Sequence, residues 1–376
     1  MLFNLLQFLP PNSRIKLETG VPDLFNNKNL TEFSNIFDIS LKNMSRYRNG
    51  TRTLPLNLFN KLVKYSSTDI VKFQDRISIK IGRSGNFLKI GPYIEINSDW
   101  VYVSQLINGD GHITPNLWYT VFVNQDEVLI KYVHSFFLDL GLSKDSFDLI
   151  KRNDANFLII RSSLISIILN KILELDIGKK DMIHLPKFIF ENKEFKIAAV
   201  RGAFDAEGCV SFTGTRRISI TSKSDIWVKQ LKKILEDLNI KSRIFIENSS
   251  REKPLYRLLI THIVNITRFS EIIKPIHSKR SKKLEQIIKS FDRNYNGKFY
   301  KDILLAIKNN VSRKRDIANY LNQNLTLINN NLFWLKKHEF IYVKDKFITN
   351  NGCFFIYALT AKGKIYLDKG SDSFFD

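Results

Sequence analysis

The sequence predicts an α+β fold in which one αββαββα unit occurs twice in tandem, between two flanking segments of mainly helical character. Two observations support this prediction. An apolar segment that ends in an acidic residue and a glycine occurs at Asp110–Gly111 and again at Glu207–Gly208. The same order of alternating and helical hydrophobic patterns then follows each of these points.

The first copy begins with the apolar segment that ends at Asp110. Alternation of apolar and polar residues predicts its strands, and apolar residues that recur on one face predict its helices, the first of which Gly141 ends. The expected elements are strands 112–114 and 118–123, helix 126–140, strands 147–152 and 157–161, and helix 163–175.

The second copy repeats this order after Glu207. In its first helix after the strands, Trp227, Leu231 and Leu235 share one face, which is typical of a helix packed on a sheet. The expected elements are strands 209–212 and 217–221, helix 224–239, strands 243–247 and 256–260, and helix 263–273. The separation of Asp110 and Glu207 is long enough for one complete unit.

The N-terminal flank predicts a helix-turn-helix. Leu30–Phe37 forms a short helix, Asp38–Ile39 a tight turn, and Ser40 can cap the next helix. That second helix carries Lys42, Arg46 and Arg48, which are candidates for DNA contact. An ordinary three-helix packing module is the alternative.

The C-terminal flank predicts a winged helix. Helices are expected over 299–308, 312–321 and 326–338, followed by a hairpin of strands 340–343 and 354–359. A dimerisation module of the same shape is the alternative. The whole chain then divides into a helix-turn-helix-like helical domain (1–70), a β-rich linker (71–98), a first repeat (99–185), a second repeat (186–295) and a winged-helix-like domain (296–376).

The charge balance favours a nucleic-acid partner. Among 376 residues, 58 Lys and Arg stand against 37 Asp and Glu, a formal net charge of +21. A protein this basic usually binds a polyanion, although an evenly solvated basic surface or a membrane-surface binder would share the composition. The stretch 274–301 is especially basic, so Lys282 and Lys283 are candidates for phosphate contact, with a solvated helix face as the alternative.

Cysteine usage and hydropathy point to a soluble protein of a reducing compartment. Cys209 and Cys353 make neither a disulfide framework nor a zinc motif, which favours a cytoplasmic location or one within an organelle. The opening run Met1–Leu9 lacks the basic leader of a secretory signal. The most apolar later stretch, Leu158–Leu175, contains too many polar residues to span a bilayer, so no membrane partner is expected.

The two repeated acids are the candidates for catalysis. Asp110 and Glu207 each follow an apolar helix and precede a glycine that lets the chain turn into a strand. If the two helices pack side by side, the carboxylates meet beside two negative helix ends and attract a divalent cation. Small residues such as Ala199 and Gly202 suit close helix packing. Paired carboxylates that hold metal ions can activate water and neutralise charge in phosphodiester hydrolysis.

The segments Val103–Gly111 and Val200–Gly208 resemble the two LAGLIDADG motifs of a monomeric homing endonuclease. The resemblance covers roughly residues 99 to 290. It implies a pseudo-twofold saddle whose two four-stranded sheets lie along the major groove of double-stranded DNA. It also implies Mg²⁺- or Mn²⁺-dependent hydrolysis of both strands by a chain that functions as a monomer.

The resemblance also implies roles for single residues. Asp110 and Glu207 would bind metal through their side chains, and Gly109 and Ala206 through their backbone carbonyls. Supporting groups are expected at the end of the second strand and after the last helix of each half, although each basic candidate there could equally be a phosphate contact or a solvated side chain. These supporting positions are Gln125 in the first half, Ser222 or Lys223 in the second, Lys179 or Lys180, and Lys279 or Arg280.

Two residues depart from the motif. The third position of the first motif is usually small but is Gln105 here, which we expect to hinder close helix packing. The sixth position, usually Asp, is Asn108, which keeps the shape and loses a charge. Both leave open a weakened or asymmetric enzyme.

Strand periodicity predicts which side chains face DNA. In the second copy Ile218 and Ile220 face the helices, which leaves Arg217, Ser219 and Thr221 on the open face. In the first copy the same reasoning places Thr120 and Asn124 on the open face, together with Trp118 and Phe122. Lys223 and Arg243 complete the set of candidate DNA contacts.

Two other functions fit the same pattern. A LAGLIDADG scaffold with helix-turn-helix flanks could be a DNA-binding regulator without catalysis, although such relatives generally lose the acids that are present here. An RNA maturase or RNA-processing factor would be equally basic, and nothing in the sequence separates RNA from DNA.

Overall fold

The computed structural model describes residues 1–17, 22–25, 29–82, 86–178, 183–212, 216–247, 254–295, 298–349 and 352–369. The chain forms two compact units. One consists of Met1–Ser211 with Arg217–Lys283, and the other of Phe212–Arg216 with Leu284–Asp376. Each unit has buried hydrophobic side chains of its own.

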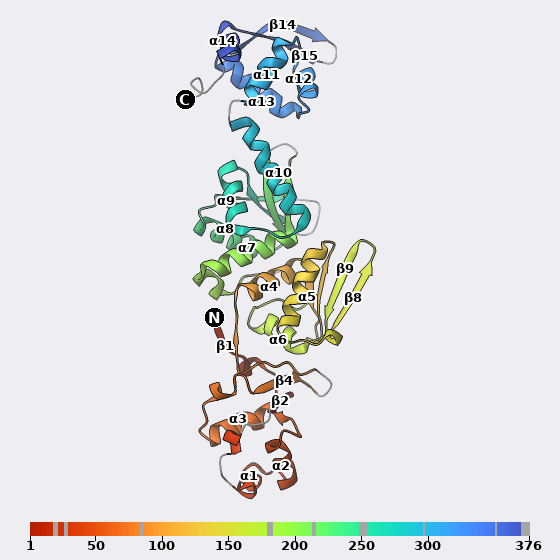
Figure 1. Ribbon diagram of the computed structural model, residues 1–376, viewed down its shortest axis with the longest axis vertical. Helices are drawn as coiled ribbons and strands as arrows, with labels where there is room; N and C mark the ends of the chain where they lie inside the picture. Colours follow the sequence, from red (N-terminus) through yellow and green to blue (C-terminus); the bar gives the residue numbers. More distant parts are fainter. Residues whose placement is uncertain are drawn as a thin grey trace. The chain divides into compact units, whose positions relative to one another are not determined.

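The first unit contains the two predicted repeats, and each has the αββαββα order (Figure 1). The first repeat consists of α4 (Ser98–Asp110), β6 (Gly111–Ile113), β7 (Thr120–Asn124), α5 (Glu127–Asp139), β8 (Phe147–Arg152), β9 (Ala155–Ile160) and α6 (Ser163–Lys171). The second consists of α7 (Lys193–Glu207), β10 (Gly208–Ser211), β11 (Arg217–Ser222), α8 (Asp225–Asp237), β12 (Arg243–Glu247), β13 (Leu255–Ile260) and α9 (Ile263–Ile273). The tandem-repeat fold class is confirmed.

The two sheets share one topology and one register. Their strand orders are β6-β7-β9-β8 and β10-β11-β13-β12, and all pairs are antiparallel. Gly111 pairs with Phe122 in the first sheet as Gly208 pairs with Ile220 in the second. The residues of one repeat can therefore be matched to those of the other position by position.

Side-chain caps begin the helices of both repeats at matching places. Asn97 caps α4 and Asn192 caps α7, and each accepts hydrogen bonds from two backbone N–H groups of the first turn. Asp126 caps α5 and Ser224 caps α8. Each cap of this kind typically contributes about 1 kcal/mol, so the polar residue before each apolar run fixes where the helix starts.

The N-terminal part of the first unit combines helices with short strands. Its helices α1 (Leu30–Phe37), α2 (Leu41–Arg48) and α3 (Leu56–Tyr65) lie where the sequence predicts them, and Asp38 adopts the left-handed conformation between the first two. Ser40 stands at the predicted N-cap but makes no side-chain cap hydrogen bond. Whether this part acts as a DNA-binding helix-turn-helix stays a prediction.

The strands around these helices are β1 (Leu2–Asn4), β2 (Ser13–Leu17), β3 (Leu54–Pro55), β4 (Ile77–Ile81) and β5 (Tyr93–Glu95). Two of them, β4 and β5, lie in the segment 71–98, for which a β-rich linker was predicted, whereas β1, β2 and β3 were not predicted. The five strands form a three-stranded sheet in the order β3-β2-β4 and a separate β1-β5 pair. Because each strand is short and finds its partner far along the chain, no local turn signal announces it.

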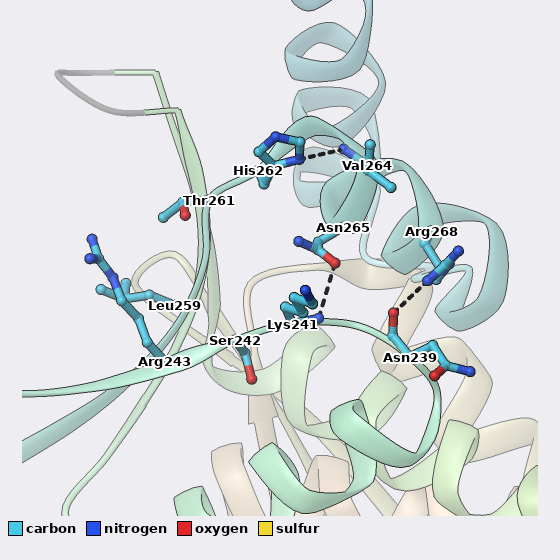
Figure 2. Close-up of a pocket in the computed structure, with 10 residues that line it drawn as sticks. All are labelled: Asn239, Lys241, Ser242, Arg243, Leu259, Thr261, His262, Val264, Asn265 and Arg268. Atoms are coloured by element: carbon cyan, nitrogen blue, oxygen red, sulfur yellow. Dashed lines mark hydrogen bonds between the residues drawn. The ribbon is translucent and has the colours of Figure 1, made fainter.

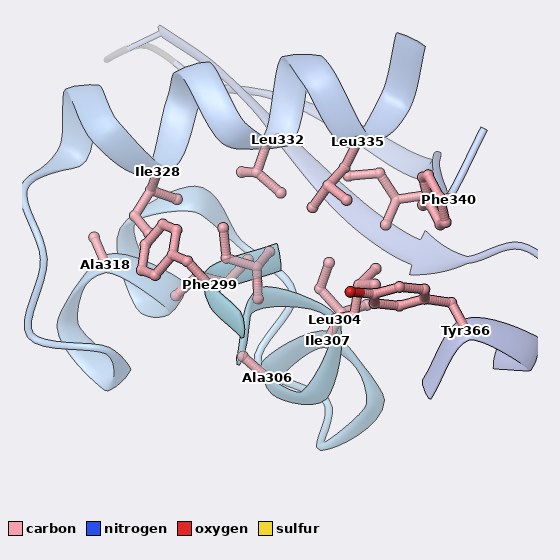
Figure 3. Close-up of a cluster of buried hydrophobic side chains, with 13 residues drawn as sticks. Phe299, Leu304, Ala306, Ile307, Ala318, Ile328, Leu332, Leu335, Phe340 and Tyr366 are labelled. Atoms are coloured by element: carbon pink, nitrogen blue, oxygen red, sulfur yellow. The ribbon is translucent and has the colours of Figure 1, made fainter. Parts of the chain in front are cut away.

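The second unit has its own core, shown in Figure 3. Ile328, Leu332 and Leu335 on one helix face Phe299 and Leu304 on another. The helices are α11 (Lys298–Lys308), α12 (Lys314–Tyr320), α13 (Leu325–Lys337) and α14 (Ala361–Lys369), the hairpin strands are β14 (Ile341–Thr349) and β15 (Gly352–Leu359), and α10 (Ser278–Tyr295) precedes them along the chain.

Three helices and a hairpin match the prediction for this flank, while α14 was not predicted. The second of these helices, expected over 312–321, begins at Lys314, with Arg313 as its N-cap residue. The winged-helix function of this unit stays a prediction, as do the five domain boundaries. In the described part of the chain, no helix combines the length and apolar character needed to cross a membrane.

Candidate metal centre and nucleic-acid interface

The site is built on close contact between α4 and α7, which lie side by side in the first unit (Figure 1). A Cβ placed on Gly109 would lie 2.4 Å from Ala206 Cβ, and one placed on Gly202 would lie 2.6 Å from the Tyr102 carbonyl oxygen. Carbon atoms in ordinary contact are about 3.5–4.0 Å apart, so neither position has room for a side chain. Glycine at these two places lets the helix backbones meet.

Asp110 and Glu207 are the last residues of these two helices. The residue after each is a glycine that begins a strand, and a Cβ on Gly111 would lie 2.4 Å from the Val121 carbonyl oxygen. The Gly109 position also lies against Glu207, whose Cγ would be 3.2 Å from the added Cβ. Asp110 is half-buried and Glu207 is exposed. The two acids therefore stand at adjoining helix ends, one shielded and one open.

Asn124 holds the shielded acid. Its Nδ2 donates to Asp110 Oδ2 at 2.7 Å, and its Oδ1 accepts from the backbone N–H of Asp126 at 2.7 Å. Asn124 is buried, as are Thr120 and Phe122. The prediction that Thr120 and Asn124 lie on the open face of the first sheet is therefore wrong. Apolar residues occupy both faces of β7, so alternation could not decide which face is inward.

The second sheet follows the prediction more closely. Ile218 and Ile220 are buried, and Arg217 and Thr221 are half-buried on the other face. Ser219 shares that face but is only 6% exposed, because it lies between Cys209 and Leu259 of the neighbouring strands. Direct contact of Ser219 with a base therefore does not fit the structure. Lys223 and Arg243 are exposed.

Arg280 lies at the acid pair. Its Nη1 donates to the backbone carbonyls of Phe204 and Asp205 near the C-terminal end of α7. Burial lowers the pKa of Arg280, while the charges of Asp110, Asp205 and Glu207 act to raise it. An arginine keeps its charge under such opposing influences, so the site has a fixed cation beside its acids.

Most of the other residues predicted to support catalysis or DNA binding are exposed or lie outside the described residues. Lys279 is exposed, so of the two basic candidates after the last helix Arg280 is the one beside the acids. Lys282, Lys283 and Gln125 are exposed. Lys179 lies outside the described residues. On α2 of the N-terminal region, Lys42, Arg46 and Arg48 are all exposed.

Two buried aspartates anchor the turn that carries Arg280. Asp205 accepts hydrogen bonds from the backbone N–H groups of Ile276 and His277, at 3.0 and 3.2 Å, and from the Tyr102 hydroxyl at 2.9 Å. Asp126 of the first repeat accepts from the backbone N–H of Ser278 at 2.6 Å. The turn before α10 is thus attached to both repeats, a connection that no local pattern in the sequence indicated.

Burial decides the direction of the pKa shifts of Asp205, Tyr102 and His277. It raises the pKa of Asp205, against the effect of the three hydrogen bonds, and raises the pKa of Tyr102 together with the Asp205 charge. Burial and the Arg280 charge lower the pKa of His277 to about 4, although His277 Nδ1 lies 2.8 Å from Asp126 Oδ2. His277 is therefore neutral at pH 7.

The two departures from the motif are accommodated. Gln105 is fully buried opposite Gly202, and its Oε1 accepts a hydrogen bond from Trp227 Nε1 at 3.0 Å. Asn108 Nδ2 lies 3.5 Å from the same oxygen. The expectation that Gln105 hinders close packing is wrong, because the facing residue is a glycine and α8 supplies a partner for the amide.

The donor set fits a small divalent cation. Two carboxylates and the carbonyl groups at two helix ends are hard oxygen donors, which Mg²⁺ and Mn²⁺ prefer. The negative ends of α4 and α7 add to the attraction for a cation. Gly109 and Ala206, whose carbonyls were predicted to help, lie in direct contact at this point.

A tandem αββαββα fold with an acid at the end of each central helix defines the LAGLIDADG class of proteins. Residues 194–274, which cover most of the second repeat, match the model of the LAGLIDADG-like domain family. No curated protein matches the chain.

Several solved structures are similar at low identity. I-DmoI in complex with DNA and Mn is 19% identical, with 48% of this chain and 98% of that chain covered and a TM-score of 0.38. Full-length DUF199/WhiA from Thermatoga maritima is 14% identical, with 65% and 93% covered and a TM-score of 0.36. The N-terminal LAGLIDADG domain of DUF199/WhiA is 16% identical, with 50% and 88% covered and a TM-score of 0.34.

Proposed function

We propose that this chain is a site-specific endonuclease that cleaves double-stranded DNA with Mg²⁺ or Mn²⁺ held between Asp110 and Glu207. The observation that carries the proposal is the contact between Gly109 and Ala206, which sets two carboxylates at adjoining helix ends with Arg280 beside both. Two carboxylates beside two negative helix ends repel one another, and a bound cation relieves this repulsion. The arrangement therefore favours a cation-binding role.

The residues around the acids have separate roles in this proposal. Asn124 fixes the orientation of Asp110 through its 2.7 Å hydrogen bond, while the exposed Glu207 faces incoming DNA. The metal supplies an activated water and neutralises charge on the phosphate. Arg280 holds a positive charge where the scissile phosphate must lie, and the anchored turn keeps it there.

Affinity for DNA comes from basic and polar groups spread over the chain. Arg217, Thr221 and Lys223 on the second sheet are accessible to base edges or phosphates, and Lys282 and Lys283 add exposed positive charge on α10. The net charge of +21 supports binding to a polyanion. The regions predicted as a helix-turn-helix and a winged helix would add further contacts to the same DNA.

The test is cleavage of a randomised duplex library by the purified chain, with Mg²⁺, with Mn²⁺ and with a chelator. We expect specific products only with metal. Asp110→Asn and Glu207→Gln should each abolish cleavage and leave DNA binding within a fewfold of the unaltered chain. Glu271→Gln removes an exposed carboxylate on α9 and is the matched control, which should cut normally.

Each other outcome has a definite meaning. Unchanged cutting by Asp110→Asn or Glu207→Gln would remove these acids from the site. Tight, specific duplex binding without cleavage under any metal condition would replace the enzyme with a DNA-binding regulator. Stronger binding to structured RNA than to duplex DNA would favour an RNA-processing factor.

A further inference from the structure

A second candidate site lies at one end of the second sheet, away from the acids. A hollow of about 560 Å³ lies here. Its lining residues come from Asn239–Arg243, where the chain enters β12, and from Leu259–Arg268, which runs from the end of β13 into α9 (Figure 2). Pockets for small ligands typically enclose about 300–1,000 Å³, so this hollow is large enough for a phosphate group with part of a nucleoside.

The lining is basic. Lys241, Arg243 and Arg268 all contribute, together with His262, and no acidic side chain is among the described residues that line it. A neighbouring hollow of about 480 Å³ provides a contrast, since there Asp237 accepts a 2.6 Å hydrogen bond from Lys196. In the first hollow no carboxylate of the lining opposes the cations, which favours an anionic ligand.

Neutral donors complete the lining. Asn265 Oδ1 accepts from the backbone N–H of Lys241 at 3.0 Å, which turns its amide nitrogen away from Lys241, as Figure 2 shows. Arg268 Nη1 donates to the Asn239 carbonyl at 2.6 Å, which holds its guanidinium at the rim. A ligand oxygen would satisfy such donors.

The first repeat serves as an internal comparison. Asp148 pairs with Ile159 as Arg243 pairs with Leu259, so an acid occupies the position of the arginine. Asp148 forms an ion pair with Arg161.

The corresponding corner of the first repeat is also covered. Asn86 Nδ2 donates to Ser146 Oγ at 3.2 Å, and Leu88 Cδ1 would lie 3.6 Å from a Cβ on Gly141. The fold itself therefore does not require an open, basic corner. That corner is a property of the second repeat alone.

We propose that this hollow binds a phosphate group through Lys241, Arg243 and Arg268. The phosphate could belong to the backbone of a bound duplex or to a free nucleotide or pyrophosphate. The duplex source rests on the proposed DNA-binding function, and the free source does not. Arginine binds phosphate through two parallel hydrogen bonds, and lysine binds it as a compact positive charge.

The test compares two doubly substituted chains that lose the same charge. Lys241→Gln with Arg243→Gln changes exposed side chains of the hollow, so folding should be unaffected. Lys229→Gln with Lys232→Gln changes α8, where these lysines contact Asp225 and Glu236. Both are made in the Asp110→Asn chain so that cleavage cannot interfere. Pyrophosphate binding is measured by calorimetry, and binding to an unrelated 30-base-pair duplex by fluorescence anisotropy over a range of salt concentrations.

The expected result is a loss of at least tenfold in pyrophosphate affinity for the hollow variant and no loss for the α8 variant. If the phosphate belongs to a bound duplex, the slope of log affinity against log salt concentration should also be smaller in magnitude, by up to about 2, in the hollow variant. An unchanged slope with lost pyrophosphate binding identifies the free ligand as the source. Equal behaviour of the two variants with both probes would overturn the proposal. Cleavage is not measured, so failure of the nuclease proposal leaves this result interpretable.

Discussion

Replacing Gly109 with alanine tests the helix contact on which the metal site depends. The new methyl group would lie 2.4 Å from Ala206 Cβ, about 1 Å closer than carbon atoms in contact allow. The helices must separate or tilt by roughly that distance. Overpacking of a well-packed core costs about 1–3 kcal/mol, and alanine regains about 1 kcal/mol of helix propensity over glycine. We expect a net loss of about 0–2 kcal/mol in the free energy of unfolding.

Cleavage should suffer more than stability. A displacement of about 1 Å at a catalytic group can lower a rate by about 10²-fold, and the methyl group acts directly between the two acids. We therefore expect Gly109→Ala to reduce metal-dependent cleavage by about that factor while duplex binding stays within a fewfold. Urea denaturation gives the stability, and single-turnover cleavage gives the rate.

The second substitution makes the test specific. Adding Ala206→Gly to Gly109→Ala removes the clashing methyl group, and the nearest remaining atom to the new Cβ is Glu207 Cγ at 3.2 Å. The double variant should recover most of the cleavage rate lost by Gly109→Ala, although Ala206→Gly alone costs about 1 kcal/mol of helix propensity. A Gly109→Ala chain with unaltered stability and rate, or a double variant that recovers nothing, would refute the close-contact argument.

Three further predictions concern the buried groups around the site. Gln105→Leu leaves the buried Trp227 indole N–H without its 3.0 Å acceptor, so we expect a loss of about 1–3 kcal/mol in unfolding free energy, whereas Ser143→Ala outside the helix pair should cost much less. The low pKa of His277, about 4, means that the unfolded chain binds a proton between pH 6.5 and 4 that the folded chain does not, so stability should fall by up to about 3 kcal/mol as the pH falls through this window. In His277→Gln the fall in unfolding free energy over this window should be smaller by up to about 3 kcal/mol. The variant is needed as a comparison because the raised pKa of Asp205 makes stability rise as the pH falls. Equal pH profiles of the two chains would exclude His277 as the group that titrates. Arg280→Gln should lower the cleavage rate at least tenfold with Arg280→Lys intermediate, and identical rates for all three chains would remove Arg280 from the site.

The tandem fold could be predicted because its signals are local and occur twice. The caps Asn97 and Asn192 were not singled out. The apolar periodicities were nevertheless sufficient to place twelve elements of the repeats within a few residues, and the acid–glycine endings placed the C-terminal ends of α4 and α7. Helices and hairpin-connected strands are specified by neighbouring residues, so a sequence contains their description. The acids at the ends of α4 and α7 followed from the same repetition.

The bounds and the pairing of the short N-terminal strands could not be predicted in this way, although a β-rich segment was expected over 71–98. β2 pairs with β4 across more than sixty residues, and β1 pairs with β5 near the start of α4. Such strands are stabilised by partners that only the folded chain brings near, and a run of three to five residues has too little pattern to reveal them.

Strand faces show where local pattern is ambiguous. In β11, isoleucines alternate with polar residues and the inward face was assigned correctly. In β7, valines and phenylalanine occupy both faces, and the polar Thr120 and Asn124 are the buried ones. Thr120 is satisfied by Ser166 Oγ at 2.9 Å and Asn124 by Asp110, so tertiary hydrogen bonds removed the usual cost of burying them.

The sequence by itself determined which residues of the two repeats form helices and strands, that the unit is repeated, and which acid ends the first helix of each repeat. Only the tertiary structure decided that Asn124 holds Asp110, that Gln105 fits opposite Gly202 with Trp227 as its partner, and that Asp126 and Asp205 from different repeats fix the turn that carries Arg280. The physical reason is the distance along the chain over which each interaction acts. Periodicity and capping involve residues a few positions apart, whereas a buried polar group finds its hydrogen-bond partner among atoms that are far away in the sequence and that packing brings near.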